Sequence, residues 1–158
     1  MAFKRATIET YAYPTEDPSK VRKALLSLIP EHLREEVKLR HEKLRGQFGY
    51  SIEKYTITVR GRKKATEVAR RIIQSLPKKD LEQLLERIDL HMDGGTLYIR
   101  VSKQKALEGV IELEEGGDII RVVLEGSSKR AVINAITRGA HRDEQNERCP
   151  DRIIRQRL

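Results

Sequence analysis

The sequence predicts an α+β fold in which a single mixed or antiparallel sheet carries its helices packed on one face. Short segments that alternate apolar and polar residues are typical of strands with one buried side. Other segments carry apolar residues at helical spacing. With 158 residues, 38% of them hydrophobic, the chain is long enough for one domain with its own core. The order of these segments, strands interrupted by single helices and helix pairs, favours the α+β class.

Alternation predicts six strands. The first runs from Phe3 to Tyr13, and the next two form a hairpin around the turn Gly46–Gly49. The last strand is apolar enough to lie centrally in the sheet. The expected strands are residues 3–13, 37–41, 54–59, 97–101, 110–113 and 119–124.

Capping residues and prolines mark the expected helices. Asp17, as N-cap, and Pro18, at the first helical position, begin a helix that Pro30 ends. Asp80 is expected to cap a later helix, which has an acidic first turn. The other expected features are an amphipathic helix over 65–76 ended by Pro77, a helical turn over 103–107, and a last helix capped by Ser127 or Ser128 and closed by Gly139.

Two regions follow from this pattern. Residues 1–139 form the α+β domain, because all the periodic segments lie there. From Ala140 onward the chain mixes charges densely and shows no sustained periodicity, which predicts a polar, basic and flexible C-terminal tail over 140–158.

Composition and motifs exclude several classes. No apolar stretch is long enough to span a membrane and the N-terminus lacks a secretory pattern, so we expect a soluble, cytoplasmic protein. The lone Cys149 forms no internal disulfide. The histidines occupy separate elements, and no nucleotide-binding or hydrolase motif occurs, so we expect no metal, no cofactor and no enzyme activity. The acids of residues 112–118 leave one alternative open, a metal-dependent RNA-cleaving enzyme.

Charge is the main indication of function. The chain has 32 Lys and Arg against 24 Asp and Glu, a net charge of +8. Residues 54–71 concentrate basic side chains opposed only by Glu67, whereas residues 80–93 and 112–118 are mostly acidic. The sequence therefore predicts a basic side and an acidic side, with an anionic partner for the former.

Three expected helix starts place cations where the helix dipole is already positive. This arrangement costs stability in the free protein and becomes favourable when a phosphate arrives, because backbone N–H groups, dipole and side chains then converge on it. Ordinary solubilising charge is the alternative reading. The phosphate contacts predicted at and beside these starts are Arg60, Arg62, Lys63, Lys64, Lys103, Lys105, Lys129 and Arg130.

Aromatic residues add a second prediction. Phe48 and Tyr50, next to Arg45 in the expected hairpin loop, are predicted to touch sugar or base. Tyr11, Tyr13 and Tyr98 lie on polar strand faces where rings can stack on unpaired bases. Packing with an exposed hydroxyl explains each tyrosine equally well.

The ordered segments Tyr13–Val21, Arg45–Gly49 and Leu97–Gly109 resemble the archaeal RNA-binding proteins described as predicted exosome subunits. The resemblance spans Phe3 to Gly139. It implies a fold similar to that of the large-subunit ribosomal protein that binds five-S rRNA, and a role in RNA processing or decay without catalysis.

We therefore expect a non-catalytic RNA-binding protein, archaeal and cytoplasmic, that acts as an accessory factor in RNA processing or degradation. Its expected partners are RNA and exosome- or ribosome-associated proteins. A protein-interaction adaptor remains the alternative, in which the basic face docks on an acidic partner subunit and the tail folds on contact.

Overall fold

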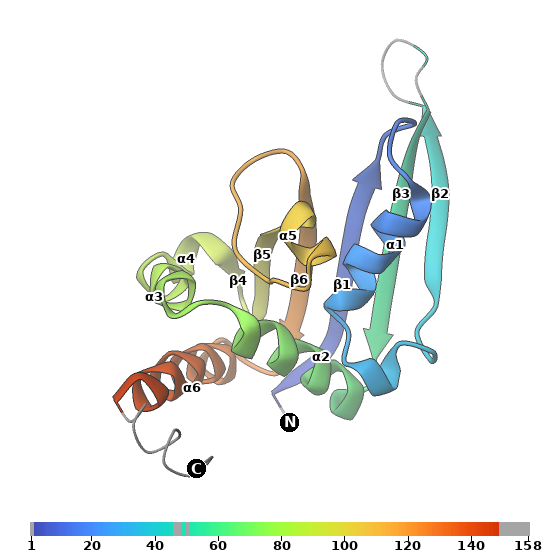
Figure 1. Ribbon diagram of the computed structural model, residues 1–158. Coiled ribbons are helices and arrows are strands. Elements are labelled where there is room, and N and C mark those ends of the chain that lie inside the picture. Colours follow the sequence, from blue (N-terminus) through green and yellow to red (C-terminus); the bar gives the residue numbers. More distant parts are fainter. Residues whose placement is uncertain (1, 46–48, 50, 149–158) are drawn as a thin grey trace, which may run out of the picture.

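The computed structural model describes residues 2–45, 49 and 51–148. This part of the chain forms a six-stranded sheet in the order β2-β3-β1-β6-β5-β4, and every pair of neighbours is antiparallel. The predicted α+β class with a single sheet is confirmed (Figure 1). The strands are β1 Phe3–Ala12, β2 Leu39–Arg45, β3 Ser51–Arg60, β4 Met92–Asp93, β5 Thr96–Ser102 and β6 Ile119–Gly126.

Strand alternation separates a buried face of the sheet from an open face. Ile8 in β1 pairs with Ile57 in β3 and Val122 in β6, and all three side chains are fully buried. The neighbouring residues Glu9 and Arg121 pair with each other and project from the opposite side. The open face is therefore polar, and the core lies between the other face and the helices.

Helices α1, α2 and α5 lie in front of the strands in Figure 1, over the buried face, whereas α3 and α4 lie beside the sheet next to β4. Asp17 caps α1 as predicted, since its carboxylate accepts a hydrogen bond from the N–H of Ser19 at 2.9 Å. The helices are α1 Pro18–Ser27, the 3₁₀ helix η1 Glu31–Leu33, α2 Arg62–Ser75, α3 Lys78–Glu86, α4 Ile88–His91, α5 Lys103–Leu107 and α6 Lys129–Arg148. Among the described residues no helix is long and apolar enough to cross a membrane.

Two expectations are wrong: the strand over residues 110–113 and the Asp80 cap. Residues 110–113 form no strand; a single bridge joins Leu113 to Val101, and Val110 is exposed. Asp80 does not cap α3, which begins at Lys78 after Pro77. Instead, the buried Asp80 carboxylate accepts a hydrogen bond from the N–H of Leu113 at 3.0 Å. A side chain from α3 thus accepts the hydrogen bond of a backbone N–H that would otherwise pair with a neighbouring strand.

The last helix does not end at Gly139. It continues to Arg148, so the first part of the predicted tail is helical. Gly139 is buried, and a Cβ at this position would lie 3.2 Å from Leu81 Cδ1 and 3.3 Å from Ile73 Cγ2. Glycine at this position does not end the helix. It permits α6 to pack closely against α2 and α3. Cys149 and the rest of the tail lie outside the described residues.

Candidate nucleic-acid interface

The strand directions place two of the three predicted basic helix starts at one end of the sheet. β3 and β6 are both antiparallel to β1, so they run in the same direction, and α2 and α6 begin where they end. β5 is antiparallel to β6, so α5 begins at the opposite end. Figure 1 shows the arrowheads of β3 and β6 pointing toward the starts of α2 and α6. The predicted contacts therefore do not form one continuous site.

Arg45 belongs to the end opposite the α2 start. It closes β2, where the hairpin turns into β3, and Arg60 lies at the far end of β3. A strand of this length spans about 30 Å, which separates Arg45 from Arg60. Phe48 and Tyr50, predicted to share its loop contact, lie outside the described residues.

The start of α2 is the most exposed of the basic helix starts. Arg60, Arg62 and Lys63 are exposed and form no ion pair with any described residue. The chain turns from β3 into α2 at Gly61, whose φ of 100° favours glycine. No side chain caps α2, and its first turn has no acid. The N–H groups at this helix start and the exposed cations beside them are thus available to an anion.

Lys64, the fourth predicted contact here, is partly neutralised. Its Nζ lies 2.9 Å from Glu36 Oε2, and both side chains are about half exposed. The hydrogen bond from Lys64 lowers the pKa of Glu36. A phosphate would have to compete with this carboxylate for Lys64.

The start of α6 is capped and half neutralised. Ser128 Oγ accepts a hydrogen bond from the N–H of Ala131 at 3.1 Å, as a serine N-cap does. Lys129 Nζ lies 2.8 Å from Asp89 Oδ1, and the hydrogen bond from Lys129 lowers the pKa of Asp89. Arg130 is exposed and forms no ion pair within the part of the chain that the structure describes. Of the two predicted contacts here, Arg130 is the more available.

Lys103 is the clearest correction to the predicted phosphate contacts. Its side chain is buried, and its Nζ lies 2.8 Å from Glu16 Oε2, 2.6 Å from Asp118 Oδ1 and 3.0 Å from the Tyr11 carbonyl oxygen. An ammonium that is buried and already surrounded by three oxygens has no room for a phosphate. Lys103 therefore holds the fold together and does not line an interface.

Lys105, two residues further along α5, is bound to Glu112 at the surface. Glu112 and Asp118 are thus held by lysines rather than directed at a common point. Among the described residues, no group of three His, Cys, Asp or Glu side chains could hold a metal ion.

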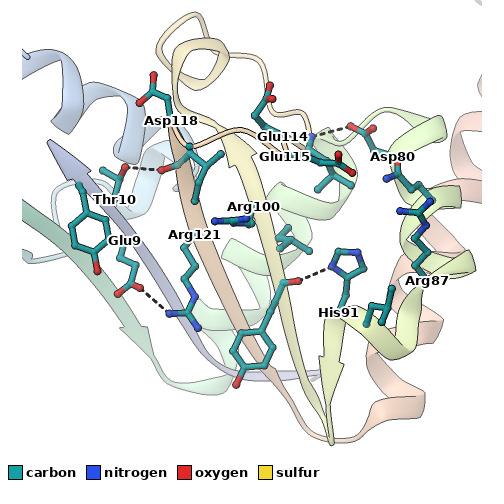
Figure 2. Close-up of a pocket in the computed structure, with 18 of the residues that line it drawn as sticks. Glu9, Thr10, Asp80, Arg87, His91, Arg100, Glu114, Glu115, Asp118 and Arg121 are labelled. Atoms are coloured by element: carbon teal, nitrogen blue, oxygen red, sulfur yellow. Dashed lines mark hydrogen bonds and ion pairs between the residues drawn. The ribbon is translucent and has the colours of Figure 1, made fainter. Parts of the chain in front are cut away.

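The open face of the sheet forms a cleft of about 1330 Å³ between α3, α4 and the loop before β6 (Figure 2). The Arg121 guanidinium lies 5.7 Å from the ring centre of Tyr98 and donates to Glu9 Oε1 at 3.2 Å. Tyr11 and Tyr98 lie on this face, as the alternation predicts. Carboxylates outnumber arginines in the lining: Glu9, Asp80, Glu114, Glu115 and Asp118 against Arg87, Arg100 and Arg121. Phosphate is therefore disfavoured here.

The sequence prediction missed a second basic region on the helical side. Arg34 and Arg71 are half-buried and line a groove together with Arg22 and Lys23 of α1. One signal was visible in the sequence, because α1 carries Lys20, Arg22 and Lys23 without any acid between Pro18 and Ser27. The approach of α1 to Arg71 needed the tertiary structure.

A polar, open antiparallel sheet has helices on its other face and, at one end, cations that form no ion pair within the described part of the chain. These features define an α+β protein suited to nucleic acid. A family model described as RNA binding matches residues 5–125, and the chain belongs to this archaeal RNA-binding family. The chain is 32% identical over 135 residues to the RNA-binding protein PAB1135 of Pyrococcus abyssi, covering 82% of this chain and 88% of that one.

Solved structures share the fold. Protein SSO0741 of Sulfolobus solfataricus superimposes with a TM-score of 0.75 at 22% identity, over 87% of this chain and 98% of that chain. Mth689 of Methanothermobacter thermautotrophicus has a TM-score of 0.64 at 24% identity, over 89% and 99% of the two chains. The sheet and helix arrangement is therefore common to several archaeal proteins.

Proposed function

We propose that the protein is a non-catalytic RNA-binding factor that contacts RNA phosphates through the end of the sheet where α2 and α6 begin. We call this region, consisting of Arg60, Arg62, Lys63 and Arg130, the basic end. One observation carries the proposal: at the α2 start, exposed cations without ion-pair partners among the described residues surround an uncapped helix N-terminus. Family membership supplies RNA as the source of the phosphate.

The proposed role is that of an accessory factor in RNA processing or degradation, associated with the exosome or the ribosome. The resemblance to predicted exosome subunits supports the first association, and the resemblance to the five-S rRNA-binding ribosomal protein supports the second. The absence of catalysis is part of the proposal. The ion pairs of Glu112 with Lys105 and of Asp118 with Lys103 support it, since they occupy two of the four acids in residues 112–118 that a metal-dependent nuclease would use.

RNA binding by the full chain, measured by fluorescence anisotropy with a labelled single-stranded RNA over a range of salt concentrations, tests the proposal. The logarithm of the affinity should fall linearly with the logarithm of salt concentration, with a slope of about −0.7 per phosphate contacted. Lys63→Glu should weaken binding about tenfold and reduce the magnitude of the slope by about one. A slope near zero for the wild type would remove phosphate contact as the mode of binding.

Lys79→Glu is the matched control, because Lys79 is an exposed lysine in the first turn of α3 and lies outside the basic end. It should leave RNA affinity within about twofold of wild type, the scale of a rim charge. Equal losses in Lys63→Glu and Lys79→Glu would indicate general attraction to a basic protein. If protein partners captured from lysate persist after nuclease treatment while purified chain binds no RNA, the adaptor alternative is favoured.

A further inference from the structure

A groove of about 520 Å³ lies on the helical side of the molecule, between α1, α2 and α5. Four cations and one acid line it, with Glu108 as the acid. Arg71 follows Lys63 by eight residues in α2, about 12 Å along the helix axis and about a quarter turn around it. The groove therefore lies on the same helix as the basic end, further from the N-terminus. We call this groove the arginine groove; its cations are Arg22, Lys23, Arg34 and Arg71.

Backbone carbonyls at the end of α1 hold two of these arginines in place. Arg71 donates from Nε and Nη2 to the Ser27 carbonyl oxygen, at 3.0 and 2.9 Å. Arg34 donates from Nε to the Ile29 carbonyl oxygen at 3.0 Å. These bonds satisfy carbonyls that the helix end leaves free. Each guanidinium has five N–H groups, so both keep donors for a further ligand.

The charges of Arg34 and Arg71 are only partly offset by nearby carboxylates. Neither guanidinium forms an ion pair with a residue that the structure describes. Burial and then the charge of Arg34 lower the pKa of Arg71, while the charge of Glu31 acts in the opposite direction. Two fixed, half-buried guanidiniums that line the same groove are stabilised when an anion binds between them.

We propose that the arginine groove binds a phosphate group, and, resting on the proposed function, that this phosphate belongs to an RNA backbone. The fork of a guanidinium matches two oxygens of a phosphate, and an arginine already held by a carbonyl loses little side-chain entropy on binding. Arg22 and Lys23 are exposed on the outer side of α1 and add charge at the mouth of the groove. RNA held at the basic end would thus have a second phosphate contact along α2.

The double variant Arg22→Gln/Lys23→Gln tests the groove without disturbing the fold, because both side chains are exposed and form no ion pair among the described residues. We expect RNA affinity in about 0.1 M salt to fall about tenfold and the salt slope to lose about one to two units. Lys20→Gln/Lys38→Gln, which removes two exposed cations outside the groove lining, is the control. Equal binding by wild type and the groove variant, with Lys63→Glu weakened, overturns the groove and leaves the proposed function standing.

A second measurement detects phosphate binding in the arginine groove directly. The Nε–H groups of Arg34 and Arg71 are hydrogen-bonded, so their signals should be observable by ¹⁵N NMR, and millimolar inorganic phosphate should shift them. Arg34→Lys, which keeps the charge and loses the fork, should remove the shift of Arg71. No shift on adding phosphate overturns the groove. A shift with phosphate in a protein that binds no RNA overturns both the proposed function and RNA as the ligand, and supports a site for free phosphate.

Discussion

Lys103 and Asp118 form an ion pair with 2.6 Å between Nζ and Oδ1, which joins the start of α5 to the loop before β6. The same ammonium binds Glu16 and the carbonyl oxygen of Tyr11, so it also connects the end of β1 to the segment before α1. One buried lysine thus links three segments that are distant in sequence.

Replacing Lys103 by Met should destabilise the protein by about 1 to 3 kcal/mol, because two carboxylates and a carbonyl lose their partner while the side-chain volume is kept. Urea denaturation at pH 7 measures the change. Lys105→Met is the matched control, since Lys105 lies two residues away and pairs with Glu112 at the surface; its urea midpoint should hardly move. A larger effect at Lys105 than at Lys103 would contradict the assignment of Lys103 as the structural link.

The contribution of Lys103 should disappear at alkaline pH. Burial alone lowers the pKa of Lys103, but hydrogen bonds to Asp118 and Glu16 outweigh burial, and the pKa of Lys103 is raised above its usual value. The folded state therefore holds the proton more tightly than the unfolded chain, where lysine titrates near about 10.4. Stabilisation is complete below that pH and is lost as pH rises through the folded pKa.

The free energy of unfolding, followed from neutral to strongly alkaline pH, tests this sign. The difference between wild type and Lys103→Met should stay constant up to about pH 9 and shrink above about pH 10.5. Using the difference cancels the titration of the other lysines and the tyrosines. A difference that grows with pH would mean that Lys103 is held neutral in the folded protein.

Sequence patterns predicted the strands and helices well where local signals decide them. Asp17 followed by Pro18 begins α1 as expected, and alternation around Ile8 and Ile57 identifies the buried face. The errors lie where a distant residue decides. Asp80 reads as a cap, yet it binds Leu113 thirty-three residues away, and Gly139 reads as a helix stop, yet it allows α6 to pack against Ile73 and Leu81.

The candidate site shows the same limit. The exposed cations at the α2 start could be predicted because a helix start and its flanking charges are adjacent in sequence. The burial of Lys103 could not, because Glu16 and Asp118 reach it from segments 87 and 15 residues away (103 − 16 and 118 − 103). Strand direction also had to be known before the α5 start could be separated from those of α2 and α6.

Lys63 should limit stability while it supports RNA binding. It lies in the first turn of α2, where a cation opposes the helix dipole. Lys63→Gln should therefore raise the free energy of unfolding by about 0.3 to 1 kcal/mol at low ionic strength, and less in about 1 M salt. Urea denaturation at two salt concentrations measures this, alongside the RNA affinity, which should fall.

Gln74→Glu is the control for the dipole effect. Gln74 is exposed near the end of α2, so a negative charge there opposes the dipole, while the net charge changes by the same amount as in Lys63→Gln. We expect it to lower stability slightly. If both variants change stability in the same direction, net charge rather than helix position explains the effect.

Gly126, which lies where β6 leads into α6, should tolerate no side chain. A Cβ at Gly126 would lie 2.2 Å from Val132 Cγ2 and 2.9 Å from the carbonyl oxygen of Gly95. The backbone oxygen cannot move aside without breaking the hydrogen bond that it accepts from the N–H of Gly126. Gly126→Ala should therefore displace the start of α6 and cost about 1 to 3 kcal/mol, the usual scale of overpacking.

Gly117→Ala isolates that steric cause, because Gly117 is exposed, has no positive φ, and a Cβ there would meet nothing within 4 Å. Its free energy of unfolding should stay within about 0.5 kcal/mol of wild type. Since Arg130 is the second residue of α6, Gly126→Ala should also weaken RNA binding, whereas Gly117→Ala should not. Loss of stability with unchanged RNA affinity in Gly126→Ala would remove the α6 start from the basic end and leave the α2 cations as the contact.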